Sequence, residues 1–329
     1  METFAFLYHP TTLSQVKHFW PVTNFLPPSF ISSYLKKSAL KIINLRDVRS
    51  ANGTDTHGYI MVMPILPDEL FETDSETILT KVIAASQMAR GLGVKILGLS
   101  GYLAAVADKK PMIYKHIKIA VTSGNSLTAW AAFESVFRKC QEAKMDLNKS
   151  TITILGTNGI GILCAAKFAA LGSKVILSAG TSQKLDTFKS TILKSHKAQV
   201  EVETDTRKAV QMADIVINTY NGPGQFIQEQ DFKPGTILCD ASVFKQLLEK
   251  IRHRSDLTVI NSGTVKTPLG QKFGQHIGFP AETISTYMAE VLLLALEESF
   301  VNYSLGENIN IDKMEAIADL AAKHGFEIL

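Results

Sequence analysis

Residues 151–171 hold the sequence pattern that most constrains the fold of this chain. The β-branched and aliphatic run Thr151–Leu155 predicts a buried parallel strand, and the apolar run Ile162–Leu171 predicts a helix soon after it. The turn between the two contains three glycines with the spacing Gly-x-x-Gly-x-Gly, namely Gly156, Gly159 and Gly161. A strand that turns through glycines into a helix leaves backbone N–H groups pointing at the space above the turn, where the missing Cβ atoms let a pyrophosphate approach.

This turn therefore predicts a dinucleotide-binding site. We expect the cofactor to contact the whole turn, which consists of Gly156, Thr157, Asn158, Gly159, Ile160 and Gly161. A tight strand–helix turn without a ligand is the alternative, because three glycines alone are a weak motif.

Further strand-like runs recur at regular intervals around this turn. Five of them follow it: Lys174–Ser178, Val200–Glu203, Ile215–Thr219, Thr236–Asp240 and Thr258–Asn261. Helical runs lie between most of them, and this alternation predicts an α/β fold with a doubly wound parallel (Rossmann) sheet. Since ligands bind past the carboxyl ends of such strands, we expect Thr219 to border the cofactor.

The segment after the second strand of this sheet bears on the choice of cofactor. In a site for NAD, an acidic residue near the end of that strand would bind the ribose hydroxyls. Here no acid occurs before Asp186, and the segment carries Thr181, Ser182 and Lys184 instead. Hydroxyls and a lysine suit a 2′-phosphate, so we predict NADP(H). The alternative is a solvated loop in which Thr181 or Ser182 caps a helix.

The N-terminal part predicts a separate α/β unit. Phe4–Tyr8 reads as an edge strand, and Asn52-Gly53 is a strong hairpin signal between the strand-like runs Lys41–Val48 and Tyr59–Met63. We therefore predict three parts: a substrate domain at 1–145, an NADP-binding domain at 146–275, and a C-terminal helical segment at 276–329 that packs back on the others.

Composition excludes several function classes. The net charge of +3 is too small to indicate nucleic-acid binding. Three widely spaced cysteines exclude a disulfide framework and a cysteine-rich metal site. Neither a signal peptide nor a transmembrane segment is expected, so we predict a cytoplasmic protein; the oligomeric state stays open.

A second strand–turn–helix junction is rich in polar residues. Ile117–Thr122 predicts a strand, which runs through Ser123-Gly124-Asn125-Ser126 into a helix. Asn125 or Ser126 can simply cap that helix. They can also face a ligand, because the helix dipole favours partial negative charge at this end.

Several motifs together resemble one known family, the aldehyde-forming acyl-acyl carrier protein reductases. The motifs are Ser123–Ala129, Gly156–Gly161, Phe273–Pro280, Met288-Ala-Glu290, Asn302–Gly306, Lys313–Ile317 and His324-Gly-Phe326, with His57-Gly58 and Leu66-Pro67 near the N-terminus. The resemblance implies an NADPH-dependent reduction of a long-chain acyl thioester to an aldehyde. It also implies acyl carrier protein or acyl-CoA as the partner that delivers the acyl group.

The chain departs from that family at one position. The family places a catalytic cysteine immediately before the Met-Ala-Glu motif, where this chain has Tyr287. A phenol with a pKa of about 10 is a poor acyl acceptor beside a thiol of about 8.5, so we expect direct hydride transfer without a covalent acyl-enzyme.

Direct hydride transfer needs a donor to the developing oxyanion, and we name Tyr287, Ser126 and His57 as candidate catalytic residues. Asn125 is a further candidate donor, while His276 and Lys266 are weaker ones. Tyr287 lies on one helical face with apolar residues and can be a packed core tyrosine; His57 can be a structural histidine.

Three functions remain open at this point. The first is a reductase of acyl thioesters or of the derived aldehydes. The second is a dehydrogenase of another, smaller carbonyl compound, and the third is a catalytically silent binder of acyl chains or of acyl carrier protein.

Overall fold

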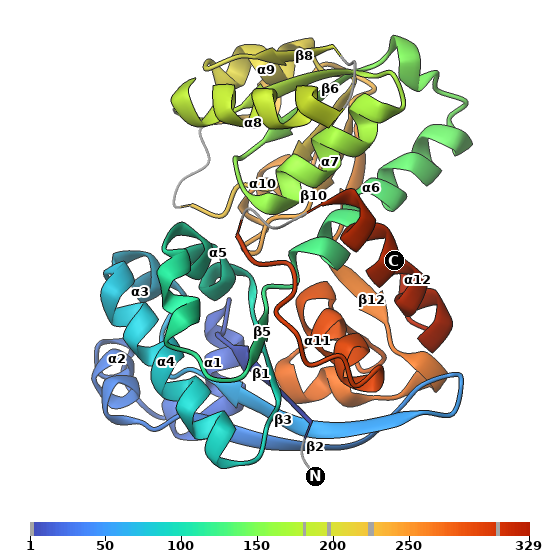
Figure 1. The fold of residues 1–329 in the computed structure, drawn as a ribbon. Helices are drawn as coiled ribbons and strands as arrows, with labels where there is room; N and C mark the ends of the chain where they lie inside the picture. The colour runs from blue at the N-terminus through green and yellow to red at the C-terminus, as the bar shows by residue number, and fades with distance from the viewer. Residues whose placement is uncertain (1–2, 180–181, 196–198, 223–226, 307–309) are drawn as a thin grey trace. The chain divides into compact units, whose positions relative to one another are not determined.

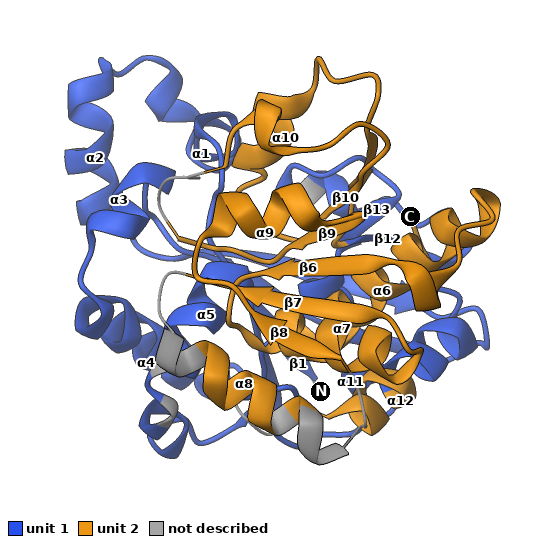
Figure 2. Ribbon diagram, turned by 90° about the horizontal axis from the view of Figure 1, so that it is seen from above, with its two compact units in different colours: residues 1–124, 264–308, 317–327 blue, residues 125–263, 309–316, 328–329 orange. Residues whose placement is uncertain are grey.

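The computed structural model describes residues 3–179, 182–195, 199–222, 227–306 and 310–329 (Figure 1). The chain forms two compact units, coloured separately in Figure 2. Unit 1 contains residues 1–124, 264–308 and 317–327, and unit 2 contains residues 125–263, 309–316 and 328–329.

Unit 2 is built on a six-stranded sheet whose neighbouring strands pair in parallel. Its strands are β6 (Thr151–Leu155), β7 (Lys174–Ser178), β8 (Val200–Val202), β9 (Ile215–Asn218), β10 (Ile237–Asp240) and β11 (Thr258–Asn261). The spatial order β11-β10-β9-β6-β7-β8 is that of doubly wound dinucleotide-binding sheets, in which the first and fourth strands are neighbours. The predicted fold class is confirmed.

Helices cover both faces of this sheet. They are α6 (Asn125–Glu142), α7 (Gly159–Ala170), α8 (Ser182–Ser195), α9 (Thr206–Met212) and α10 (Gln246–Ile251). Figure 2 shows α9 and α10 on one face and α6, α7 and α8 on the other. Strand β6 is buried between these layers, with its residues Ile152 and Ile154 fully shielded from solvent, as the continuous apolar run predicts.

Unit 1 has a five-stranded sheet of order β2-β3-β1-β4-β5. The strands are β1 (Phe4–Tyr8), β2 (Lys41–Arg49), β3 (Asp55–Val62), β4 (Ile96–Leu99) and β5 (Ala120–Thr122). The hairpin is confirmed, since β2 and β3 pair antiparallel and Gly53 in their turn has φ +90. The edge position predicted for Phe4–Tyr8 is wrong, because β1 pairs with both β3 and β4 and all five of its residues are buried.

Short helices surround this sheet. They are α1 (Leu13–Phe19), the 3-10 turn η1 (Pro21–Asn24), α2 (Pro28–Lys37), α3 (Pro67–Glu72), α4 (Ser75–Gly91), α5 (Gly101–Lys109) and the 3-10 turn η2 (Pro111–Lys115). Asp74 caps α4 by accepting a hydrogen bond from the amide of Thr77.

The C-terminal part of the chain also contributes to unit 1. Strands β12 (Thr264–Lys266) and β13 (Thr283–Ser285) pair antiparallel, and α11 (Thr286–Leu296) follows directly. The apolar run from about Glu282 to Phe300 predicts a longer helix, and α11 is shorter at both ends. Helix α11 packs on β1, β3 and β4, and Val291 lies so close to Gly98 that a Cβ there would fall 2.8 Å from it.

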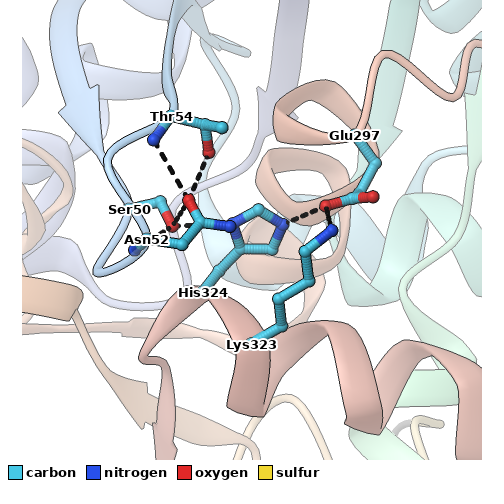
Figure 3. Close-up of polar contacts among 6 residues, drawn as sticks. All are labelled: Ser50, Asn52, Thr54, Glu297, Lys323 and His324. Atoms are coloured by element: carbon cyan, nitrogen blue, oxygen red, sulfur yellow. Dashed lines mark hydrogen bonds and ion pairs between the residues drawn. The ribbon is translucent and has the colours of Figure 1, made fainter.

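The last helix, α12 (Ile311–His324), is followed by the short strand β14 (Glu327–Ile328). Polar contacts around the buried side chain of His324 join the end of α12 to the β2–β3 hairpin (Figure 3). His324 Nδ1 lies 2.7 Å from Ser50 Oγ, and its Nε2 lies 2.5 Å from Glu297 Oε1. Lys323 donates to the same carboxylate oxygen at 2.6 Å, and the Ala51 amide donates to the carbonyl of His324 at 3.0 Å.

The unit bounds differ from the predicted domain bounds, and residues 276–329 form no unit of their own but are divided between unit 1 and unit 2. Residues 125–145 belong to unit 2 because α6 packs against α7 and β10. Residues 264–275 belong to unit 1, where β12 pairs with β13. The roles assigned to the parts, substrate binding and cofactor binding, stay predictions. No helix in the described ranges combines the length and apolar character of a membrane span.

Candidate functional site

The glycine turn lies at the point where the order of the unit 2 sheet reverses. It follows β6, and the neighbouring strand β9 ends at Asn218, just before Thr219. The helices after these two strands lie on opposite faces of the sheet, which opens a crevice beyond their carboxyl ends. The sequence therefore places the turn where doubly wound sheets bind their ligands.

Thr219 fixes the shape of this turn. Its hydroxyl donates to the carbonyl of Leu155 at 2.9 Å, and its own amide donates there at 2.8 Å. Gly156 has φ +110, and a Cβ on it would lie 2.7 Å from the Thr219 hydroxyl. A Cβ on Gly161 would lie 3.0 Å from the carbonyl oxygen of Gly156 and 3.1 Å from the same hydroxyl. The positive φ and this close approach therefore require glycine at 156, and a Cβ at 161 would be crowded. Thr219 borders the turn, and its predicted contact with the cofactor stays a prediction.

Asn158 caps helix α7 and ties it to β9. Its side-chain oxygen accepts from the Gly161 amide at 3.0 Å, and its side-chain nitrogen donates to the Thr219 carbonyl at 2.6 Å. The amide of Gly161, in the first turn of α7, thus already donates within the protein. Within the described residues, the amides of Gly159 and Ile160 donate no hydrogen bond to another protein group.

These observations fit a pyrophosphate. The residues from Gly156 to Gly159 are partly exposed, and the helix N-terminus offers two N–H donors together with the positive end of its dipole. Gly156, Thr157, Asn158, Gly159, Ile160 and Gly161 would hold this part of a dinucleotide; their cofactor contacts remain a prediction.

The structure describes none of the side chains that are predicted to contact a 2′-phosphate. Thr181 lies outside the described residues. Ser182 and Lys184 belong to the first turn of α8, but their side chains are likewise outside the described part of the chain. The preference for NADP(H) over NAD(H) remains a prediction.

The second candidate site lies at the carboxyl end of β5 in unit 1. The hydroxyl of Thr122 bonds to Oε1 of Glu290 on α11, and Ser123 donates to the carbonyl of Ser304. Gly124 has φ +72, and a Cβ there would lie 2.5 Å from Cα of Tyr287. The first turn of α11 therefore packs directly on the end of β5, and only glycine permits that approach.

The segment 302–306 runs beside the same strand. Asn302 accepts from the amide of Val121 at 2.9 Å, and Tyr303 donates its own amide to the carbonyl of Val121 at 2.9 Å. Burial, followed by the charge of Glu290, raises the pKa of the Tyr303 phenol. Three of the motifs that carry the family resemblance, around Ser123, Glu290 and Asn302, thus meet at one place in unit 1.

Sequence reasoning did not assign Glu290 or Thr122 a role. Glu290 is fully buried, and Tyr287 lies one helical turn before it with 7% of its surface exposed. The available signal was a lone acidic residue inside the apolar run from Tyr287 to Leu296. Such a residue needs a buried partner, which Thr122 supplies from 168 positions away.

The structure separates His57 from Tyr287, two of the three catalytic candidates. His57 lies at the start of β3, where its carbonyl accepts from the Thr3 amide at 3.1 Å. His57 therefore lies at the amino ends of the parallel strands of unit 1, whereas Tyr287 lies at their carboxyl ends. The two positions are roughly 15 Å apart, the length of five residues of strand. Ser126, like Asn125, is buried in the first turn of α6 and belongs to unit 2. The geometry does not bring His57 and Tyr287 into one site.

The two weaker candidates, Lys266 and His276, are not assigned to either candidate site. Lys266 ends β12 and lies 3.8 Å from the carboxylate of Glu327. The side chain of His276 is not among the described ones.

None of the three cysteines stands near β5 or on α11. Cys140, Cys164 and Cys239 are all buried in unit 2, and the thiols of Cys164 and Cys239 point at backbone carbonyls of α6. Burial raises the pKa of Cys140 to about 11 and that of Cys239 to about 12, and it raises the pKa of Cys164 as well. Buried thiols with raised pKa values are inert, and Cys239 is fully buried within β10.

Two characterised proteins resemble the chain in sequence. The aminotransferase PigE of Serratia sp. is 24% identical, with 98% of this chain but 39% of PigE covered. This chain thus spans about two-fifths of the length of PigE. The long-chain acyl-[acyl-carrier-protein] reductase of Synechococcus elongatus is 25% identical, with 88% of this chain and 87% of that protein covered. No family model matches the chain.

Solved structures are more distant. Shikimate dehydrogenase of Aquifex aeolicus is 13% identical, with 79% of this chain and 86% of that chain covered and a TM-score of 0.36. The nucleotide-binding domain of glutamyl-tRNA reductase of Thermoplasma volcanium is 14% identical, with 42% and 85% covered and a TM-score of 0.27. The similarity to the reductase of Synechococcus elongatus agrees with the motif resemblance and with an NAD(P)-dependent oxidoreductase, the class predicted from the sequence.

Proposed function

We propose that this protein is an NADPH-dependent reductase of long-chain acyl thioesters, which forms the aldehyde by direct hydride transfer without a covalent acyl-cysteine. The observation that carries the proposal is the glycine turn at the point where the sheet order reverses, shaped by Thr219 and Asn158 to offer two backbone donors. The sequence similarity to the long-chain acyl-[acyl-carrier-protein] reductase supports the substrate class.

The absence of an available thiol supports the non-covalent route. All three cysteines are buried in unit 2 with raised pKa values, and position 287 before the Met-Ala-Glu motif is a tyrosine. A thiolate is the form that attacks a thioester, and these thiols resist ionisation.

We assign the chemistry to the chain's own residues as follows. The amides of Gly159 and Ile160 would bind the pyrophosphate and so orient the cofactor, whose nicotinamide would supply the hydride. Tyr287 donates a hydrogen bond to the thioester carbonyl oxygen, where negative charge develops as the carbon accepts the hydride. Collapse of that oxyanion releases the carrier thiolate and leaves the aldehyde. An oxyanion donor of this kind contributes about 100–1,000-fold to the rate.

The proposal is tested by offering the protein a long-chain acyl carrier protein thioester, the matching acyl-CoA and the matching aldehyde, each with NADPH and separately with NADH. We expect NADPH to be consumed with the thioesters and the aldehyde to be found among the products. If no thioester and no aldehyde leads to loss of NADPH, the proposed activity is wrong.

One observation favours a second candidate function. The hydroxyl of Tyr287 is shielded from solvent, as a packed core tyrosine would be. The protein would then be a catalytically silent binder of acyl chains or of acyl carrier protein. Tight NADPH binding and retention of an acyl chain, without turnover of any carbonyl substrate, would favour this second function. Turnover of a smaller carbonyl compound alone would indicate a dehydrogenase that has changed its substrate.

A further inference from the structure

The N-terminal helices of unit 1 expose large apolar side chains. Phe25 is 87% exposed and Phe30 is 62% exposed, and Val22 and Leu13 are each 43% exposed. They come from α1, η1, the residue that ends η1 and the first turns of α2, which lies at the periphery of unit 1 in Figures 1 and 2. Single exposed apolar residues are ordinary, but several on consecutive elements mark an interaction surface.

Helix α2 shows that this exposure follows the helical repeat. Its buried residues Ile31 and Leu35 are one turn apart and anchor the helix to unit 1. Phe30, Tyr34 and Lys37 share the opposite stripe, because positions i, i+4 and i+7 lie on one face. The outer stripe of α2 is therefore aromatic at its start and cationic at its end.

The sequence segment that bears these side chains carries charge of one sign. Between residues 3 and 46 the sequence contains four lysines and one arginine but no aspartate or glutamate, in a chain with 31 acidic residues. Lys36 and Lys37 are exposed at the end of α2. Within the described residues, this segment contacts an acidic side chain on α3, where Glu69 accepts from Ser32 and lies 3.4 Å from Lys36. That pair occupies the side of α2 away from Phe30.

We propose that this face, defined by Val22, Phe25, Phe30, Tyr34 and Lys37, docks the protein on the surface of a membrane that carries anionic lipids. Apolar side chains that insert at the level of the headgroups, combined with lysines and no acidic residue, are the recognised chemistry of interfacial helices. Pro27 and Pro28 separate the end of η1, where Phe25 lies, from Phe30 in α2, so the two exposed rings come from different elements. An acidic protein surface would engage the lysines but would not bury both rings.

The test uses the full chain and vesicles of two compositions, pure phosphatidylcholine and an equimolar mixture of phosphatidylcholine with phosphatidylglycerol. We expect cosedimentation with the mixed vesicles, weaker binding at high salt, and little binding to phosphatidylcholine alone. The double variant Phe25→Ser/Phe30→Ser is expected to lower the partition constant at least tenfold. Lys37→Glu is expected to lower it several-fold.

Matched variants control for general effects. Met112→Ser and Val301→Ser remove apolar side chains of unit 1 that are 60% and 54% exposed outside this face, and Lys118→Glu makes the same change of charge outside it. These three variants are expected to bind as the wild type does. Thermal unfolding of all variants verifies that they fold, because truncating an exposed side chain costs little stability.

Three results would overturn the proposal. The wild type could bind neither vesicle, or the double phenylalanine variant could bind mixed vesicles as tightly as the wild type. The third is that Phe25→Ser/Phe30→Ser loses binding to acyl carrier protein while the wild type ignores vesicles, which would assign the face to an acidic protein. None of these outcomes depends on the reductase activity.

Discussion

The carboxyl of Glu290 and the hydroxyl of Thr122 meet inside unit 1, where both side chains are fully buried. This contact joins the end of β5 to the first half of α11, one turn after Tyr287. A buried carboxyl is costly unless it is hydrogen-bonded, so the pair fixes α11 against the sheet and with it the position of Tyr287. The geometry of the proposed substrate side thus depends on a contact between residues 168 positions apart.

We predict that Thr122→Val lowers the free energy of unfolding by about 1–3 kcal/mol, because a buried acceptor loses its donor. It should also lower the turnover number, since α11 is then free to shift. Thr23→Val is the matched control: its buried hydroxyl bonds the Trp20 carbonyl at 2.7 Å, far from β5 in sequence. Denaturant unfolding measures the stability of both variants, and steady-state kinetics measure their turnover numbers. Equal turnover in both would show that the Glu290 contact has no bearing on catalysis.

Tyr287→Phe separates a catalytic phenol from a packing one. If the hydroxyl donates to the oxyanion, turnover falls about 100–1,000-fold while the affinity for NADPH stays unchanged. Tyr114→Phe serves as the control, because that buried phenol donates to Asp108 at 2.7 Å instead. Wild-type turnover in Tyr287→Phe would remove the tyrosine from the mechanism.

The cysteines give a direct test of the covalent route. We predict that a thiol reagent modifies Cys140, Cys164 and Cys239 only slowly in the native protein, because all three are buried with raised pKa values. Activity should survive treatment with the reagent, and labelling should become complete on unfolding. Rapid inactivation with labelling of one cysteine would contradict the direct hydride transfer proposed above.

The cluster at the end of α12 predicts a dependence of stability on pH. Hydrogen bonds from Lys323 and from His324, and to a lesser extent their charges, hold the pKa of Glu297 below its usual value of 4.5. A carboxyl with a lowered pKa in the folded state contributes stability above its unfolded pKa and loses it as the pH falls through the folded value. We therefore expect Glu297→Gln to unfold more easily than the wild type at neutral pH, and the difference to shrink below about pH 4.5. A difference that stays constant between neutral and acidic pH would contradict this assignment.

The fold of unit 2 could be predicted from sequence because its signals are local. The strand Thr151–Leu155, the glycines of the turn and the apolar helix follow one another directly, and the later strands β7, β9 and β10 are largely apolar runs. The same holds for the hairpin at Asn52-Gly53.

Features that depend on distant segments were not predictable in this way. Phe4–Tyr8 has the composition of a strand, but its central place depends on β3 and β4, which come from about 50 and 90 positions later in the chain. Helix α11 begins only at Thr286 because Thr283–Ser285 forms a strand that pairs with β12. The partner of Glu290 and the separation of His57 from Tyr287 likewise follow from tertiary packing.

The central claim, that the glycine turn binds a nicotinamide dinucleotide, is tested most directly by titrating the protein with NADPH and following its fluorescence. Gly156→Ala is compared with Gly235→Ala, because both glycines lie in unit 2 with positive φ, +110 and +81, but a Cβ on Gly235 meets nothing within 4 Å. Each variant carries a backbone strain of about 1–2 kcal/mol, whereas Gly156→Ala alone pushes against Thr219. We predict that the wild type and Gly235→Ala bind NADPH and that Gly156→Ala binds at least about tenfold more weakly. No binding by the wild type, or equal binding by the two variants, would contradict the account.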